Sequence, residues 1–349
     1  MIDFSIKKIF GLMAKTLPFL VFRFLIYFGI TLVYMLVTGG GAGIGYLIGK
    51  IGSSEADAAN SASVWGGIIG FGAVSTAVYF FREYLLYMVK AGHIAVLTEI
   101  MDGGTIPGGR GQIDYAQKMV RERFAQSSVM FGLDQLIKGV LKAFNRAFFT
   151  ITSFIPIPGL EGLVKFINSV VNLSLTYLDE VILAYNFRTR ATNPWKASQK
   201  ALILYAQNYK SFLKNAFFMT FVIWGLTFVT FLVVLIVAAG ISKILPDMPG
   251  ALTVLVAVVF AWGIKQAVIE PIGMTALMQV FFKVTEGQEP NPEWEAKLDK
   301  LSKKFGNLKK KAVEWVGKGD DDDAKDPAPK AAPDSPPSDP SNPSISSPF

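Results

Sequence analysis

The chain has no cysteine and a single histidine, His93, among its 349 residues. Without cysteine there is no disulfide bond and no thiolate metal site, and one histidine leaves carboxylates as the only abundant metal ligands. The sequence also lacks a recognisable nucleophile–base pair. We therefore expect no catalytic residue, no metal and no cofactor, and we interpret the chain as a protein other than an enzyme.

What the chain has in abundance is apolar surface, since 51% of its residues are hydrophobic and 28 are phenylalanine. These residues gather in long blocks, which is typical of membrane proteins. The net charge of +7 resembles that of a nucleic-acid-binding protein. Because the basic residues flank the apolar blocks, as the orientation of membrane helices requires, we expect no nucleic-acid partner.

Four segments have the roughly 20 apolar residues that a membrane-spanning helix needs, and they are 17–37, 64–81, 215–241 and 250–269. The first is too long for a cleaved signal peptide. A fifth region, 147–187, has two apolar arms around a Pro-rich turn, Ile155 to Gly159. It forms either two more spans or a re-entrant or interfacial hairpin. The sequence predicts an all-α polytopic protein with four to six transmembrane helices, six being the preferred number.

The basic residues lie on alternate sides of these segments. Lys7, Lys8, Lys15 and Arg23 accompany the start of the first span, and 188–214 is also lysine- and arginine-rich. The connections 51–63 and 245–250 contain neither residue. The positive-inside rule then predicts an even number of spans in the plasma (inner) membrane, with both termini cytoplasmic.

Two stretches resemble each other at a constant offset of 183 residues, 81–107 and 264–290. Gly104 aligns with Gly287 and Pro107 with Pro290. This pattern indicates a parallel internal repeat of two membrane hairpins, although apolar helices also resemble each other by composition alone. The glycine-rich loop 102–112 could cradle a phosphate, but its second copy lacks most of the glycines. We therefore interpret it as a turn between helices.

Three glycines after the first span, Gly41, Gly45 and Gly49, recur every four residues. This spacing places them on one helix face, where small residues permit close helix contact in lipid. The alternative is a loop loosened by glycine.

The segment 291–317 is expected to be a basic amphipathic helix. Its apolar stripe comprises Trp294, Leu298, Leu301, Phe305, Leu308, Ala312 and Trp315. Lysines occupy its other faces, and the candidate lipid-binding residues are Lys303, Lys304, Lys309, Lys310 and Lys311. The stripe could instead pack on the chain's own helix 114–131 or form a coiled coil within a homo-oligomer.

Ionisable and amide side chains in apolar segments are candidate functional residues. Lys165, Asn168, Asn172 and Asp179 follow a helical spacing, with Glu180 beside them. A polar interfacial helix would show the same pattern. Farther on, Glu270 precedes Pro271, which would kink the helix and free a carbonyl. The candidate substrate-binding residues are Asn168, Asn172, Asp179, Glu180 and Glu270.

These features divide the chain into five parts. They are a first membrane hairpin with an amphipathic helix (1–131), an uncertain membrane or re-entrant hairpin (132–190), a second membrane hairpin (191–290), the basic amphipathic helix (291–317), and an acidic, proline-rich tail predicted to be disordered (318–349).

The stretches 185–237 and 259–282, beginning "YNFRTRATNPWKASQK" and "VFAWGIKQAVIEP", resemble the closing part of the choline transporter-like family of polytopic membrane proteins. The resemblance covers roughly a third of the chain, and the family's cysteine-rich segment and large extracellular loop are absent. It implies a membrane transporter and assigns no binding residue.

Two functions are compatible with these patterns. The first is a transporter or permeation protein for a small solute, lined by the polar face at 165–180. The second is a membrane-embedded scaffold that recruits lipids or partner proteins through its basic helices.

Overall fold

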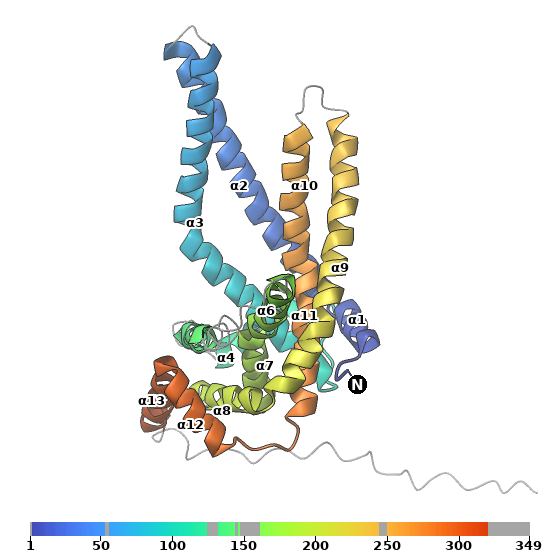
Figure 1. Cartoon of the computed structure of the whole chain (residues 1–349), viewed down its shortest axis with the longest axis vertical. Helices are drawn as coiled ribbons and strands as arrows, with labels where there is room; N and C mark the ends of the chain where they lie inside the picture. The colour runs from blue at the N-terminus through green and yellow to red at the C-terminus, as the bar shows by residue number, and fades with distance from the viewer. Residues whose placement is uncertain are drawn as a thin grey trace, which may run out of the picture.

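The computed structural model describes residues 2–52, 56–123, 132–143, 146, 161–243 and 250–319. The secondary structure of these residues is helical, in agreement with the predicted fold class. Two long hairpins rise side by side from a base of shorter helices, and their tips lie at the same end of the molecule (Figure 1). The predicted disordered tail beyond residue 319 and the turn region 147–160 lie outside the described residues.

The first hairpin is built from α2 (Leu17–Gly52) and α3 (Ala56–Met101). It is preceded by the short amphipathic helix α1 (Ile6–Lys15). A single residue, Thr16, separates α1 from α2, and its hydroxyl donates a hydrogen bond to the Leu12 carbonyl at 2.9 Å. The same hydroxyl lies 3.2 Å from the imidazole Nε2 of His93 on α3. This contact fixes the joint between α1 and α2 against the lower part of α3.

Glycine allows α2 and α3 to touch backbone to backbone. A Cβ atom added at Gly45 would collide with the carbonyl of Ala62, and one added at Gly49 would lie 2.7 Å from the Cα of Ala59. Gly70 of α3 faces the Val37 carbonyl in the same way, at 2.7 Å. The predicted ridge of Gly41, Gly45 and Gly49 is therefore confirmed, and it lies on a helix rather than in a loosened loop.

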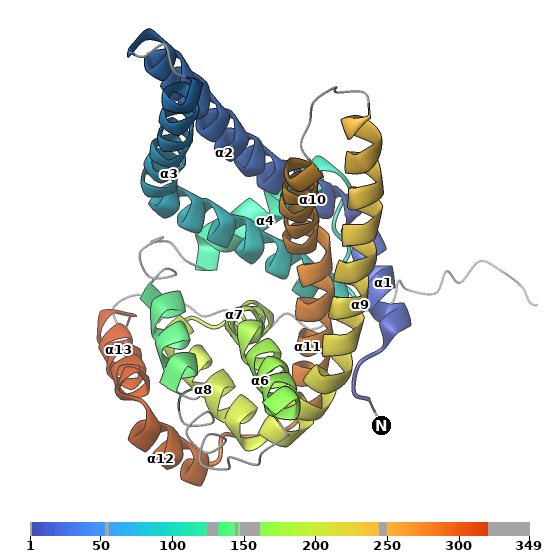
Figure 2. The same cartoon turned by 45° about the horizontal axis from the view of Figure 1, so that its top comes forward.

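The second hairpin consists of α9 (Tyr209–Ser242), α10 (Gly250–Ile264), a π-helical turn η1 (Lys265–Ile269) and α11 (Glu270–Val284). It follows α8 (Pro194–Gln207) after the single residue Asn208. Figure 2 shows the two hairpins leaning apart toward their tips.

Large apolar side chains cover the outside of both hairpins. Ile51 is 87% exposed and Ile236 72% exposed, and aromatic side chains such as Trp224 and Phe228 are also exposed. A water-soluble protein does not expose so much contiguous apolar surface, whereas lipid accommodates it. Among the described residues, four helical stretches are long and apolar enough to cross a membrane, namely Leu17–Gly52, Lys165–Thr189, Tyr209–Ser242 and Val256–Val284. The chain is an integral membrane protein.

The base consists of α4 (Arg110–Arg123), a helix at 132–143, α6 (Glu161–Thr176), α7 (Leu178–Thr189), α8, α12 (Pro292–Leu301) and α13 (Lys303–Gly319), together with the lower ends of the hairpins. It contains the main hydrophobic core, to which Ile94, Leu133, Ile182, Leu202 and Phe281 contribute fully buried side chains. Helix α8 begins where the Asn193 side chain accepts the Lys196 N–H at 3.0 Å, a typical N-cap, with Pro194 in the first turn.

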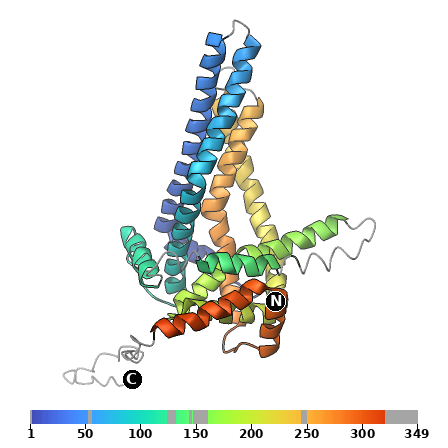
Figure 3. The ribbon, with the colours of Figure 1, turned by 90° about the vertical axis from the view of Figure 1, so that its left-hand side faces the viewer.

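The preferred six spans are not found among the described residues. Lys165–Thr189 is long enough to cross a membrane, but the helix breaks at Tyr177 and half of its apolar window is buried inside the protein. Helix α6 runs crosswise to the hairpins at the top of the base (Figure 3). Val170 and Val171 of α6 are buried, whereas Ile167 is 39% exposed, so the described part of α6 is only partly covered by the protein. The interfacial hairpin stays a prediction.

The predicted amphipathic helix 291–317 is also not continuous, because Ser302 adopts an extended conformation (φ −143°, ψ 111°) between α12 and α13. Leu298, Phe305 and Leu308 are fully buried, whereas Leu301, at the break, is 45% exposed. Helices α12 and α13 pack on α8. Part of the alternative partner, 124–131, lies outside the described residues. Because of the break at Ser302, the regularly spaced apolar residues of 291–317 do not form one continuous helix face.

The order of elements repeats as the sequence predicted. In both halves a short basal helix leads through one residue into a rising helix, and a descending helix follows. The descending helices end at Met101 and Val284, residues separated by the same 183 positions as the aligned stretches. Each is followed by a turn with a glycine at positive φ, Gly103 (89°) and Gly287 (69°). The interpretation of the glycine-rich loop as a turn agrees with this geometry.

We expect Gly45→Val to destabilise the protein by about 1–3 kcal/mol, because the added methyl groups must push α2 away from α3. Gly43→Val is the matched control, since Gly43 is exposed and nothing lies within 4 Å of its Cβ position. Equilibrium unfolding in mixed detergent micelles measures both variants. Equal stabilities of the two variants would contradict the close packing described for this hairpin.

Candidate functional site

Charged side chains from both hairpins and from α7 lie close together where the hairpins enter the base. Arg23 of α2 and Glu180 of α7 are buried, and Lys90 of α3 with Lys265 and Glu270 at the two ends of η1 are partly buried. Helix α10 spans 15 residues, or about 22 Å along its axis, before Lys265. We call these five residues the junction network. It lies near the basal edge of the apolar zone, where ionisable groups are retained chiefly for function or for helix pairing.

The π-helical turn leaves one carbonyl without a donor. In an α-helix the Gln266 carbonyl would accept the N–H of Glu270, but that N–H donates to the Lys265 carbonyl instead. The next residue, Pro271, has no N–H to offer. The Arg23 guanidinium fills the gap, because its Nη2 donates to the Gln266 carbonyl at 2.9 Å. The two hairpins are thus joined by a charge-assisted hydrogen bond to a helix interruption.

Arg23 retains unused hydrogen-bonding capacity. Its side chain is only 1% exposed, and its Nε and Nη1 have no hydrogen-bond partner within the structure. Its guanidinium carbon lies 5.9 Å from the centre of the Tyr27 ring. The negative charges of Glu270 and Glu180 both act on the guanidinium and offset part of the cost of burying it. Glu270 itself forms an ion pair with Lys265 at 3.2 Å.

Lys90 and Glu180 form the second ion pair of the network and connect α3 to α7. The Glu180 side chain is 3% exposed and that of Lys90 27% exposed. The second carboxylate oxygen of Glu180 is buried without a partner. Because a buried charge depends on its counter-charge, this pair holds the lower part of the first hairpin against the base.

A cavity of about 320 Å³ lies beside the network and is lined by Asn172, Thr176 and Asp179 together with Lys138 and Lys142. Of the predicted substrate-binding residues, the structure thus brings Asn172 and Asp179 together. Their neighbour Glu180 belongs to the Lys90 pair instead. Asn168 is partly buried, and its side-chain oxygen has no partner. Glu270 reaches the network from the other hairpin, so the five predicted residues occupy more than one environment.

The predicted lipid-binding lysines lie on α13, at the end of the molecule opposite the hairpin tips (Figure 3). Lys309 forms ion pairs with Glu295 at 2.8 Å and Asp299 at 2.7 Å, and these hydrogen-bonded carboxylates raise its pKa. The Lys311 ammonium lies 4.9 Å from the centre of the Trp195 ring. Lys303, Lys304 and Lys310 are exposed. These three leave positive charge exposed on α13.

The sequence did not single out Arg23 and Lys90 as site residues. Arg23 was interpreted as one of the basic residues flanking the first span, although it is the seventh residue of α2. Two features of the sequence could have identified Arg23. It lies one to two turns inside an apolar helix, and Glu270-Pro271 predicts a carbonyl without a donor elsewhere in the chain. Nothing in the local sequence showed that the two would meet.

No family model, curated protein or solved structure matches this chain. The predicted resemblance to the choline transporter-like family is therefore not tested by these comparisons. The described residues also contain no group of three or more histidine, cysteine or carboxylate side chains that could hold a metal ion. The arrangement offers a buried guanidinium, two ion pairs and a helix interruption at the contact between two hairpins.

We expect Arg23→Leu to cost about 1–3 kcal/mol of stability, because the Gln266 carbonyl would be left buried without a donor. Adding Pro271→Ala should recover part of this loss, since alanine restores an N–H at the position that a π-helical turn uses. The test is a double-mutant cycle from equilibrium unfolding in detergent. Pro292→Ala, at the first turn of α12, is the control. Strict additivity of Arg23→Leu and Pro271→Ala would show that Arg23 does not compensate for the proline.

For the second ion pair we expect Lys90→Met and Glu180→Gln each to destabilise the protein by on the order of 3 kcal/mol, because each leaves a buried partner unpaired. The exposed pair Lys200–Glu289, 2.8 Å long, is the control. Lys200→Met should change stability by less than about 1 kcal/mol, because water screens that pair. Similar losses for the buried and exposed pairs would contradict the role assigned to Lys90 and Glu180.

Proposed function

We propose that the protein carries a small polar solute across the membrane and that the junction network handles the solute. The observation behind this proposal is the buried Arg23 guanidinium, which has two unpartnered nitrogens and faces the interrupted helix of the other hairpin. Helix interruptions at the interface of two structural repeats are where many secondary transporters bind their solutes.

The chemistry of the network suggests what kind of solute would suit it. Arg23 offers unused donors, and Glu180 offers an unused acceptor oxygen. Glu270 and Lys265 add one charge of each sign. A solute with a charged group could therefore supply the hydrogen-bond partners that these groups lack. The resemblance of residues 185–237 and 259–282 to the choline transporter-like family supports a transporter as well, and the solute itself stays open.

The proposed orientation follows from the positive-inside rule. The N-terminal arm, the basic connections and the basal helices all lie at one end, opposite the hairpin tips (Figure 1). We infer that this end faces the cytoplasm and that the apolar hairpins cross the plasma (inner) membrane. The cavity beside Asn172 and Asp179 would then be reached from the cytoplasmic side.

A second candidate function is a membrane-embedded scaffold. The observation that favours it is the exposed charge of Lys303, Lys304 and Lys310, which remains after the apolar stripe of α13 is buried in the base. A helix whose apolar face is already covered does not insert into lipid. It would recruit an acidic partner, an anionic surface or a second copy of the chain through charge alone.

The transport hypothesis is tested by flux into proteoliposomes that contain the full chain. Choline, glutamate and inorganic phosphate serve as radiolabelled probes of three charge types. We expect Glu270→Gln and Asp179→Asn to reduce flux of the accepted probe at least about tenfold, because each removes a carboxyl group from the junction network or from the cavity beside it. Lys200→Gln, on the exposed basal surface, should not change it.

The proposed transport of these classes of solute would be overturned if correctly folded protein gives no more flux of any of the three probes than empty liposomes do. The scaffold alternative is separated by replacing Lys303, Lys304 and Lys310 with glutamine. That triple variant should lose partner or surface binding under the scaffold hypothesis and keep its flux under the transport hypothesis.

A further inference from the structure

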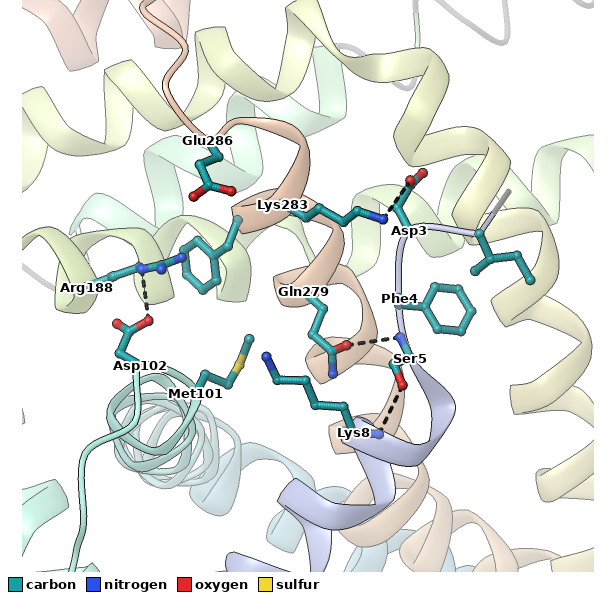
Figure 4. A pocket seen from close by; sticks show the side chains of 12 residues that line it. Asp3, Phe4, Ser5, Lys8, Met101, Asp102, Arg188, Gln279, Lys283 and Glu286 are labelled. Atoms are coloured by element: carbon teal, nitrogen blue, oxygen red, sulfur yellow. Dashed lines mark hydrogen bonds and ion pairs between the residues drawn. The ribbon is translucent and has the colours of Figure 1, made fainter.

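A second cavity, of about 410 Å³, shares no lining residue with the cavity beside Asn172 and Asp179. It is lined by the N-terminal arm, by Lys8 of α1, and by Met101 and Asp102 at the end of α3. Arg188 of α7 and Gln279 of α11 complete its wall (Figure 4). None of these residues was singled out as a binding residue by the sequence patterns.

The N-terminal arm is held in place by hydrogen bonds and ion pairs of the Asp3 carboxylate. The Asp3 carboxylate accepts hydrogen bonds from Lys214 at 2.7 Å and from the Asn215 amide at 2.8 Å, and Lys283 lies 3.4 Å away. Chiefly because of the Lys214 hydrogen bond, the pKa of Asp3 falls to about 2, so the carboxylate is charged at neutral pH. The Asp3 carboxylate is therefore occupied by its own donors.

Two other charged residues of the wall are also paired. Arg188 Nε contacts the Asp102 carboxylate at 3.1 Å, and its guanidinium carbon lies 4.3 Å from the centre of the Phe282 ring. Glu286 is exposed at the rim, where water screens its charge.

Gln279 and Lys8 each contribute a hydrogen-bond donor for which the described residues supply no acceptor. Gln279 is only 8% exposed, and its side-chain oxygen accepts the Ser5 N–H at 3.1 Å, which fixes the orientation of the amide. Its amide nitrogen is buried and has no partner. Lys8 carries the other donor, and Figure 4 shows its ammonium and the Gln279 amide nitrogen directed toward the same space. A buried amide N–H without an acceptor costs free energy that a ligand oxygen would recover.

We propose that this cavity binds a small oxyanion, a phosphate or carboxylate group whose oxygens accept hydrogen bonds from both Lys8 and Gln279. The positive charge of Lys8 attracts the anion, and the fixed amide of Gln279 orients it. The cavity is larger than such a group, so it also accommodates part of the molecule that carries it. This site is separate from the junction network and does not depend on the proposed transport.

The oxyanion has two possible sources with the same chemistry. Helix α1, beside the cavity, exposes Ile6 (52%) and Phe10 (48%) on its outer face. Such a helix lies in the headgroup region of a bilayer, so the phosphate of an anionic lipid would be within reach of the cavity. A free phosphate would enter from the aqueous side.

The first experiment measures binding of inorganic phosphate to the full chain in uncharged detergent by titration calorimetry, at constant ionic strength. Lys8→Gln removes the cation, and Gln279→Glu keeps the acceptor for Ser5 while replacing the donor by a negative oxygen. Each should weaken binding about tenfold or more, the effect of one hydrogen bond to a charged group. Lys8→Arg should retain binding.

Lys7→Gln is the matched control, because Lys7 has the same charge on the same helix and does not line the cavity. It should change the affinity less than about twofold, since exposed charges act weakly at a distance. A second experiment measures how strongly phosphatidylglycerol is retained by each variant in nanodiscs of mixed phosphatidylglycerol and phosphatidylcholine, by native mass spectrometry.

Phosphate binding that Lys8→Gln and Gln279→Glu abolish would support a free oxyanion as ligand. The lipid headgroup would be supported if the unmodified chain retains phosphatidylglycerol and binds no phosphate, and if the same two variants no longer retain the lipid. The proposal is overturned if neither probe binds, or if Lys7→Gln weakens binding as much as Lys8→Gln does. Should Gln279→Glu fail to fold, the comparison of Lys8→Gln, Lys8→Arg and Lys7→Gln decides the question.

Discussion

The hydrogen bond from Arg23 to the Gln266 carbonyl is the interaction on which the arrangement of the two hairpins depends. Pro271 and the shifted Glu270 N–H leave this carbonyl without a donor from its own helix. Satisfying it requires a donor from outside the helix, and only a long side chain on the neighbouring hairpin reaches it. The interruption in one hairpin therefore fixes the position of the other, and the nearby carboxylates make the buried cation tolerable.

The hairpins and the base are stabilised in different ways. The hairpins expose their apolar side chains to lipid and contain few buried residues toward their tips, so contact between α2 and α3 relies on glycine and alanine. The base excludes water in the usual way, with a core of fully buried aliphatic and aromatic residues. The two parts meet at the junction network, where Arg23 and Glu180 are buried together with partly buried ionisable side chains.

Local patterns in the sequence were enough to predict the helices of the two hairpins, the glycine ridge and a turn after each descending helix, although the glycine at positive φ in the first turn is Gly103 and not the aligned Gly104. They failed where a distant contact decides the structure. The spacing of the 291–317 stripe predicted one helix, yet Ser302 breaks it so that both pieces fit α8. The arm at Asp3 meets Asn215, which is 212 residues away, and no local signal indicates such a pair. Asn172 and Asp179 were predicted to share a helix face and instead line one cavity across the break at Tyr177.

The single-residue joints at Thr16 and Asn208 have a mechanical consequence. Each rising helix continues almost directly from a basal helix, and both joints are held by side-chain hydrogen bonds, Thr16 to Leu12 and Asn208 to Leu204. A bilayer of different thickness changes the tilt that a long apolar helix adopts. Because these joints are short and hydrogen-bonded, we expect that a change in the tilt of α2 or α9 also rotates α1 or α8. A change in bilayer thickness would then exert a torque on the core of the base.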